Sequence, residues 1–396
     1  MYDFETVIDR RKTDSIKWKD IDEKYGVEDL LPMWVADMDF RTAPEIIGRF
    51  KKKLDLGIFG YYKIDDSCFQ AIISWLDRRH GFKVDRSWIV FVPGVVTGLN
   101  IAALSFLEEG DRAIVQAPIY PQFYNVLKNR GIETLVNPLV LGEEGYGMDL
   151  EDLEEKIDSR TRALFFCNPH NPTGRVWTEE ELIRLGEISR RKDILIVSDD
   201  IHSDIIRASS KYSPLAKLSE DLAQNTISFY APSKSFNLAG LSTAIAIIPN
   251  EAYRKKFIAS MEKIHLPLSN TFGKDGLEAA YDKGEKWLDE LNDYIDGNLR
   301  LAHDYIGENI GGLGSYIPEG TYLMWLDFSA FKLSNDEINR ILIREGRLLL
   351  NNGLDYGREG QGYFRMNVAC PRKTLMEGLR RLEKAVKIMK KQEDRK

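Results

Sequence analysis

Between residues 88 and 250, short apolar runs alternate with longer amphipathic segments, and this alternation restricts the fold more than any other feature. Seven runs have the length and composition of strands, at residues 89–92, 113–116, 133–136, 163–167, 194–198, 226–230 and 243–248. Most gaps carry helical patterns, such as residues 178–191, which open with a capping threonine followed by glutamates. Strands that are apolar on both faces and alternate with helices indicate a parallel sheet with helical cover. The predicted fold class is α/β, with a mostly parallel seven-stranded sheet covered by helices.

The two ends of the chain lack this pattern. Residues 1–50 are rich in turns, and from about residue 285 long helical patterns mix with strands predicted near 322–327 and 363–368. The last predicted helix carries an apolar stripe, typical of core packing, at Leu375, Leu379, Leu382, Val386 and Met389. We expect a large domain at 51–285 and a smaller α+β domain at 286–396, to which the N-terminal segment 1–50 contributes.

Charge and cysteine content exclude several classes of protein. The 396 residues include 55 Lys and Arg against 62 Asp and Glu, a net charge of −7, which offers no basic face for nucleic acid. Three widely separated cysteines without a Cys-x-x-Cys pair argue against a disulfide framework or a thiolate zinc site. The uncharged stretch 87–107 contains proline and glycine, so it predicts a strand, a turn and a helix rather than a membrane span. We expect a cytoplasmic protein without nucleic-acid or membrane partners.

Polar or turn-forming residues follow five of the predicted strands. These clusters lie at 93–98, 117–120, 168–174, 199–202 and 233–234, and ligands of open parallel sheets bind at that edge. Lys234 is the only charged residue between Asp221 and Glu251. An apolar setting disfavours the charged form of a lysine, so its amine becomes a usable nucleophile and base. The alternative is a surface lysine that happens to follow a strand.

Asp199 ends a strongly apolar run, so we expect it to be partly buried beside a cationic partner, although a capping carboxylate is an alternative. A lysine and an aspartate at one sheet edge match the requirements of pyridoxal phosphate, which needs a lysine for covalent attachment and an acid facing its pyridine nitrogen. The helix start at 94–97 offers backbone N–H groups to a phosphate.

Three ordered motifs strengthen this interpretation: NPHNPTG at 168–174, VSDDIH at 197–202 and YAPSKSFNLAGL at 230–241. The chain resembles the fold-type I pyridoxal phosphate enzymes, the aspartate aminotransferase superfamily. More narrowly, WVADMDF at 34–40 and FRMNVACPR at 364–372 resemble the cystathionine β-lyase and cystalysin-like C–S lyase branch.

The resemblance implies roles for matching residues. Around the cofactor it implies Lys234 as attachment point and base, Asp199 at the pyridine nitrogen, Asn171 at the 3-oxygen, Tyr120 on the ring face, Val95 and Val96 at the phosphate, Ser233 and His202 beside them, and Tyr61 reaching the phosphate of the other subunit of a homodimer. For the substrate it implies Arg365 as the fork that binds the α-carboxylate, with Asn171 and Ala36 beside it. Lys234, Tyr120 and Tyr61 are then the catalytic candidates.

Two positions depart from the aminotransferase pattern. His202 stands where a tyrosine is usual, and Ser242 stands where an arginine usually binds the phosphate. Both departures are typical of the lyase branch, but they leave the positive partner of the phosphate unnamed. Asp200 stands where a glutamate is commoner in that branch, with no effect that the sequence assigns.

The resemblance implies β-elimination from cystathionine or a related sulfur amino acid, giving a thiol, pyruvate and ammonia. Transamination on the same residues is the first alternative, and a lyase with a second, regulatory protein-binding role is another. For the remaining candidates we expect structural roles: Cys167 and Cys370 in the core, Arg372 between segments and His170 within its loop. The five histidines show no metal-ligand spacing.

Overall fold

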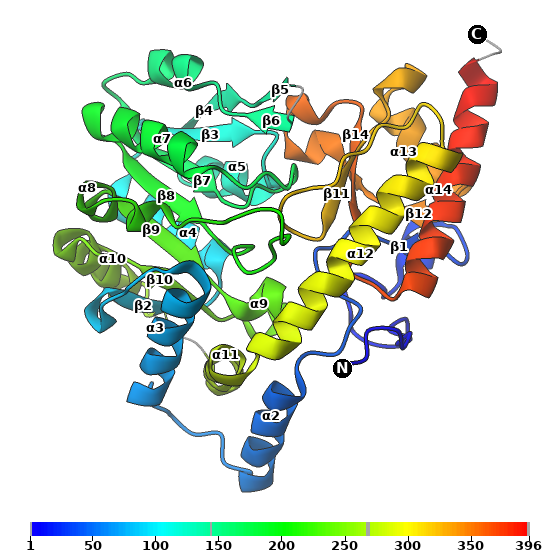
Figure 1. Cartoon of the computed structure of the whole chain (residues 1–396). Coiled ribbons are helices and arrows are strands. Elements are labelled where there is room, and N and C mark those ends of the chain that lie inside the picture. The colour runs from blue at the N-terminus through cyan, green and yellow to red at the C-terminus, as the bar shows by residue number, and fades with distance from the viewer. Residues whose placement is uncertain (1, 143–144, 267–269, 394–396) are drawn as a thin grey trace.

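The computed structural model describes residues 2–142, 145–266 and 270–393 (Figure 1). All seven predicted strands are present and form one sheet in the order β2-β10-β9-β8-β7-β3-β4. Their bounds are β2 (Ile89–Val92), β3 (Arg112–Ala117), β4 (Glu133–Pro138), β7 (Thr161–Cys167), β8 (Leu195–Asp199), β9 (Thr226–Tyr230) and β10 (Ala244–Ile247). Only β10 runs antiparallel to its neighbours in this sheet, which confirms the mostly parallel α/β prediction.

Helices cover both faces of the sheet, as Figure 1 shows. In β7, Phe165 packs with α4 (Val95–Phe106), α5 (Pro121–Lys128) and α10 (Glu251–Lys263) on one face. Its neighbours Leu164 and Phe166 pack with α6 (Leu150–Lys156) and α7 (Glu179–Arg191) on the other. Because successive side chains of a strand point to opposite faces, a strand buried on both sides must be apolar throughout.

The predicted helix starts and the uncharged stretch also take the expected form. Thr178 caps α7 and forms a reciprocal capping box with Glu181. The stretch 87–107 forms the end of a short turn, β2 and α4. Within the described part of the chain, no helix has both the length and the apolar character needed to cross a bilayer.

The C-terminal region contains long helices and a second, antiparallel sheet. Its main elements are α12 (Glu285–Asn309), β11 (Leu323–Asp327), α13 (Asn335–Arg344), β13 (Asn351–Asn352), β14 (Tyr363–Asn367) and α14 (Arg372–Glu393), with β14 between β11 and β13. The predicted apolar stripe of α14 is buried. Strand β1 (Leu31–Pro32) pairs with β12 (Leu348–Leu349), so the N-terminal segment joins this region.

Shorter elements connect these layers. Helices α2 (Pro44–Leu56) and α3 (Asp66–His80) both pack against α11 (Thr271–Lys283). Besides short 3-10 turns, the remaining described α-helices and strands are α1 (Ile21–Tyr25), β5 (Val140–Gly142), β6 (Gly145–Gly147), α8 (Glu220–Gln224) and α9 (Pro232–Ser235).

A buried ionic cluster fixes the N-terminal segment against the rest of the molecule. The Lys17 amine donates to an Asp39 carboxylate oxygen at 2.7 Å, and Arg10 binds both Asp37 and Asp39. The amide of Asn237 donates to the carbonyl oxygens of Met38 and Phe40. Ion pairs withdrawn from water hold their geometry when every charge is matched. The cluster therefore sets the position of residues 34–36, which border the cavity described next.

Candidate active site

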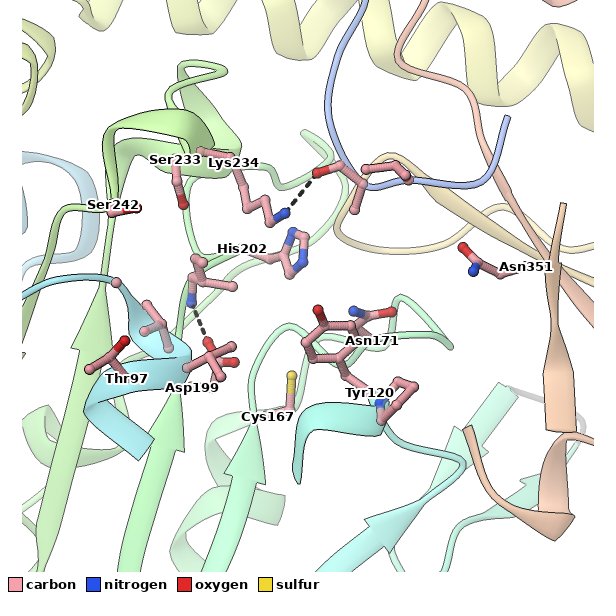
Figure 2. Close-up of a pocket in the computed structure, with 18 of the residues that line it drawn as sticks. Thr97, Tyr120, Cys167, Asn171, Asp199, His202, Ser233, Lys234, Ser242 and Asn351 are labelled. Atoms are coloured by element: carbon pink, nitrogen blue, oxygen red, sulfur yellow. Dashed lines mark hydrogen bonds between the residues drawn. The ribbon is translucent and has the colours of Figure 1, made fainter. Parts of the chain in front are cut away.

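A cavity of about 540 Å³ lies at the carboxyl edge of the main sheet (Figure 2). Its size falls within the range of roughly 300–1,000 Å³ typical of small-molecule sites. Segments that follow β2, β3, β7, β8 and β9 line it, together with β13, β14 and residues 34–36. Ten of the eleven predicted site residues border it: Ala36, Val95, Val96, Tyr120, Asn171, Asp199, His202, Ser233, Lys234 and Arg365.

Lys234 lies in α9, directly after β9, and its amine points into the cavity. The amine donates a hydrogen bond to the carbonyl oxygen of Ala36 at 2.7 Å. The hydroxyl of Tyr322 donates to the same oxygen at 3.0 Å. Burial of the amine, with repulsion from Arg365, lowers the pKa of Lys234 to about 8. A substantial fraction of the amine is therefore neutral near physiological pH.

Asp199 ends β8 on another wall of the same cavity (Figure 2). One carboxylate oxygen accepts the Ile201 N–H at 3.1 Å. Burial raises the pKa of Asp199 to about 6, so a cationic ligand group facing it would stabilise its ionised form. The adjacent Asp200 does not line the cavity and instead accepts a hydrogen bond from the Tyr212 hydroxyl at 2.7 Å.

Arg365 projects from β14 and is almost fully buried. Its guanidinium donates to the side-chain oxygens of Asn171 at 3.0 Å and Asn351 at 2.7 Å, and to the Trp34 carbonyl oxygen at 2.8 Å. The buried Nε–H has no partner within the described residues. Of the five guanidinium donors, Nε–H and one terminal N–H therefore remain for a ligand carboxylate. Asn171 contributes its oxygen, which leaves its amide N–H groups as donors.

The start of α4 forms another end of the cavity. Gly94 adopts a positive φ of 99° before the helix, a conformation that glycine reaches without steric cost. A Cβ on Gly98 would lie 2.4 Å from the Phe229 ring, so glycine lets α4 approach β9 closely. The positive end of a helix and its free N–H groups bind anions. The side chains of Thr97, Ser233 and Ser242 line this part of the cavity, as Figure 2 shows.

Tyr61 is the one predicted site residue that does not border the cavity. Its side chain is fully exposed.

His202 and Cys167 both line the cavity, and the structure shows what surrounds each of them. The buried His202 ring packs edge-on against Tyr322, and burial keeps its pKa well below the ordinary value. Cys167 is buried in the core as expected, and it also lines the cavity.

Several cavity residues were not among the predicted site residues. Asn351 lies in β13, and Asp355 and Tyr356 lie in the turn that follows it, all outside the predicted strand ends. Trp34 opens the WVADMDF motif, Thr97 lies in the turn-forming cluster at 93–98 and Ser242 directly follows the YAPSKSFNLAGL motif, but the resemblance implied no cofactor role for them. The signal that could have found Asn351 and Asp355 is their place thirteen and nine residues before the FRMNVACPR motif.

His170 and Arg372, for which the sequence predicts structural roles, contact other parts of the protein and do not line the cavity. His170 hydrogen-bonds the Thr173 hydroxyl at 2.9 Å and the Gln116 carbonyl oxygen at 3.2 Å. The Arg372 backbone N–H donates to the Tyr294 hydroxyl, and its guanidinium lies 4.8 Å from that ring centre. Among the residues that the structure describes, no group of three or more potential ligands could hold a metal ion.

The cavity residues fit pyridoxal phosphate. The Lys234 amine, with its lowered pKa, matches the aldehyde of the cofactor. The buried Asp199 carboxylate on another wall matches its pyridine nitrogen. The start of α4, which hydroxyl groups line, matches its phosphate. The individual residue roles remain predictions.

Comparisons with known proteins agree with this fit. The chain is 43% identical over 379 residues to the cystathionine β-lyase PatB of Bacillus subtilis, covering 96% of this chain and 98% of PatB. The crystal structure of cystalysin from Treponema denticola, which contains pyridoxal 5'-phosphate, has a TM-score of 0.95 and 34% identity, over 98% and 100% of the two chains. A PLP-bound C–S lyase from Staphylococcus hominis has a TM-score of 0.90 and 32% identity, over 97% and 99%. Residues 29–382 match the family described as aminotransferase class I and II. The chain belongs to this aminotransferase class I and II family.

Proposed function

We propose that the protein is a pyridoxal-phosphate-dependent carbon–sulfur lyase of the cystathionine β-lyase type. It cleaves L-cystathionine or a related sulfur amino acid to a thiol, pyruvate and ammonia. The observation that carries the proposal is the placement of the Lys234 amine, the Asp199 carboxylate and the Arg365 guanidinium around one cavity. The similarity to cystathionine β-lyase PatB and to the C–S lyases supports the choice of reaction.

Individual residues hold the cofactor in this proposal. Lys234 binds it covalently, Asp199 faces its pyridine nitrogen, Tyr120 covers its ring and Asn171 donates to its 3-oxygen. The N–H groups of Val95 and Val96 bind its phosphate, with the hydroxyls around them as further donors. When bound, pyridoxal phosphate supplies an electron-accepting ring, and the Asp199 carboxylate favours the protonated form of that ring.

Arg365 orients the substrate. Its guanidinium fork binds the α-carboxylate in two parallel hydrogen bonds, a geometry that lysine cannot reproduce. Asn351 and the Trp34 carbonyl oxygen hold the guanidinium in place. Fixing the carboxylate restricts rotation of the substrate and brings its α-hydrogen toward Lys234. Such positioning contributes several kcal/mol to lowering the barrier, out of a limit of about 7–11 kcal/mol.

Lys234 moves the proton. In its neutral form the amine removes the α-proton, and the carbon–sulfur bond then breaks with both electrons leaving on sulfur. A thiol has a pKa near ~8.5, so a thiolate leaves with little help from an acid. Water hydrolyses the remaining unsaturated amino acid to pyruvate and ammonia, so the atoms balance without an oxidant or reductant.

Transamination is the second candidate, since the family includes aminotransferases and the same lysine, aspartate and arginine serve both reactions. Incubation with L-cystathionine and no keto acid separates the two. The lyase releases pyruvate and thiol over many turnovers. An aminotransferase converts one equivalent of its cofactor to the amine form and then stops, and that outcome would reject the lyase.

We also propose that the protein acts as a homodimer in which Tyr61 binds the cofactor phosphate of the partner subunit. Supporting this, the end of α2 and the segment that follows it expose apolar side chains, which are Leu54, Leu56, Ile58, Phe59 and Tyr61. Exposed apolar surface of this kind marks an interaction site.

We propose the same division into domains as the sequence predicts. Residues 51–285 would form the cofactor-binding domain, and residues 286–396 together with 1–50 would form the smaller domain. Three free, buried cysteines suit a cytoplasmic, reducing environment.

A further inference from the structure

Asp355 places a second carboxylate in the active-site cavity, on a wall formed by the turn Gly353–Tyr356. Apart from Asp199, it is the only acidic side chain among the described residues that line the cavity. No hydrogen bond or ion pair within the described residues holds its carboxylate. The proposed reaction, which uses Lys234, Asp199 and Arg365, leaves Asp355 without a function.

The turn that carries Asp355 is firmly held. The Asn352 side chain accepts the Leu354 N–H at 3.1 Å, and the Tyr356 carbonyl oxygen accepts the Ile119 N–H at 2.8 Å. A Cβ on Gly353 would lie 2.1 Å from the Gly360 carbonyl oxygen, so the turn is closely packed. The structure therefore fixes the backbone of Asp355 at the cavity before any ligand binds.

The Asp355 side chain is exposed to solvent and also borders the cavity. Partial burial raises its pKa above the ordinary value, and the nearby charge of Arg365 offsets part of this effect. Arg365 forms no ion pair with it, and three of the Arg365 donors go to Asn171, Asn351 and the Trp34 carbonyl oxygen. An unpaired carboxylate at the cavity can bind a cationic group of a ligand.

We propose that Asp355 determines substrate specificity by binding the distal ammonium of a substrate whose leaving thiol carries its own amino group. This inference rests on the proposed lyase function. The α-carboxylate of the substrate occupies Arg365, and its α-amino group reacts beside Lys234, which leaves the second ammonium for Asp355. The preferred substrate class is therefore two amino acids joined through sulfur, of which L-cystathionine is an example, rather than cysteine with a simple alkyl group on sulfur.

The test compares Asp355→Asn with wild-type protein on L-cystathionine and on S-methyl-L-cysteine, which lacks a distal amine. Loss of a charge-assisted hydrogen bond should lower kcat/KM for cystathionine about 10-fold or more, mainly through KM. The value for S-methyl-L-cysteine should change less than about 2-fold, because that substrate never contacts the carboxylate. Asp355→Glu, which keeps the charge, should recover part of the loss.

Glu359→Gln is the matched control, because this carboxylate lies on the neighbouring turn, pairs with Arg358 and does not line the cavity. Equal losses on both substrates would overturn the inference, since Asp355 would then act on Arg365 or the cofactor. Unchanged kinetics on both would overturn it as well. Absence of pyruvate from wild-type protein with either substrate would instead reject the lyase function, and this inference with it.

Discussion

The Lys234 amine donates a hydrogen bond to the Ala36 carbonyl oxygen at 2.7 Å, although 198 residues separate the two in the chain. The N-terminal segment therefore positions the candidate base of the main sheet. That segment is itself held by the buried Lys17–Asp39 pair and by the Asn367 amide, which donates to the carbonyl oxygens of Val35 and Asp37. The acceptor for the lysine is thus fixed from several sides.

The lowered pKa of Lys234 predicts the pH dependence of cofactor uptake. Only the neutral amine attacks an aldehyde, so the uptake rate should follow its neutral fraction. With a pKa of about 8, the rate should rise about tenfold per pH unit below pH 8 and then level off. Visible absorbance during addition of pyridoxal phosphate to cofactor-free protein measures this rate.

Borohydride reduction followed by peptide mass spectrometry should then locate the cofactor on Lys234. Lys234→Ala is the control and should show no trapped cofactor. A rate that keeps rising toward pH 10 would show that the amine has an ordinary pKa and would contradict this prediction. Trapping on another lysine would contradict the site itself.

Tyr322→Phe should raise the pKa of Lys234 without disturbing the fold. The Tyr322 hydroxyl shares the Ala36 oxygen with the lysine. Once it is removed, that oxygen becomes a better acceptor for the ammonium form. A hydrogen bond contributes about 1 kcal/mol, which corresponds to a shift of up to about 0.7 pKa unit. The midpoint of cofactor uptake against pH should move upward accordingly.

Tyr305→Phe is a matched control, since the Tyr305 hydroxyl donates to Glu383, away from the cavity. It should leave the midpoint where it is in wild-type protein. An unchanged midpoint in Tyr322→Phe would show that the shared acceptor does not influence the lysine.

The main sheet could be predicted from sequence because its strands are buried on both faces. A run such as Leu164–Phe165–Phe166 leaves no surface position for a polar residue, so composition reveals both the strand and its place in the sheet. The pairing of β1 with β12 could not be predicted, since each has only two residues and the pair joins distant parts of the chain. Two-residue strands have no periodicity to detect.

The site was predictable where a strand end brings its residues to one edge, as for Asn171, Asp199 and Lys234. It was not predictable for Asp355 and Asn351, because tertiary packing of the C-terminal region decides which turns reach the cavity. Tyr322 lies in a predicted strand region, but its hydroxyl is linked to the site only through the Ala36 carbonyl oxygen, which also accepts the hydrogen bond from Lys234. Contacts between distant segments leave no local pattern in the sequence.

Asp199→Asn should reduce turnover by about 100-fold or more while the protein stays folded. The amide cannot supply the negative charge that favours a protonated pyridine, and losing one electrostatic contact to a developing charge costs about 10²–10³ in kcat. Steady-state pyruvate release measures turnover, and far-UV circular dichroism checks the fold. Exposed Asp221→Asn serves as control. Wild-type turnover in Asp199→Asn would remove this carboxylate from the mechanism.

The buried carboxyl groups behind the cavity predict how stability depends on pH. Burial raises the pKa of Asp200 to about 7 and that of Asp199 to about 6. The folded chain then holds protons that the unfolded chain releases above about pH 4, so these two carboxyl groups make the free energy of unfolding fall as pH rises from about 4 to 7. The buried His170 and His202 act in the opposite direction, because burial lowers their pKa values and the unfolded chain holds their protons up to about pH 6.5. Urea denaturation of cofactor-free wild-type and Asp200→Asn protein across this range therefore isolates the contribution of Asp200.

The free energy of unfolding of Asp200→Asn relative to wild type should rise as pH goes from about 4 to 7, because the amide has no proton to release and the Asp200 contribution is lost. Asp336→Asn, at an exposed position in α13, should leave the pH dependence as in wild-type protein. The same pH dependence in Asp200→Asn and wild type would show that Asp200 already ionises freely in the folded protein.

Subunit exchange tests whether Tyr61 acts across a dimer interface. Tyr61→Ala and Lys234→Ala should each have low activity alone. In a mixed dimer, the subunit that keeps Lys234 receives Tyr61 from its partner, so one of the two sites is complete. Random exchange makes about half of the dimers mixed, and activity should recover to about one quarter of the wild-type value. If Tyr61 served its own subunit, no site in the mixed dimer would hold both residues and activity would not recover. A monomer with full activity would contradict the arrangement as well, because the fully exposed Tyr61 side chain lies outside the cavity of its own chain.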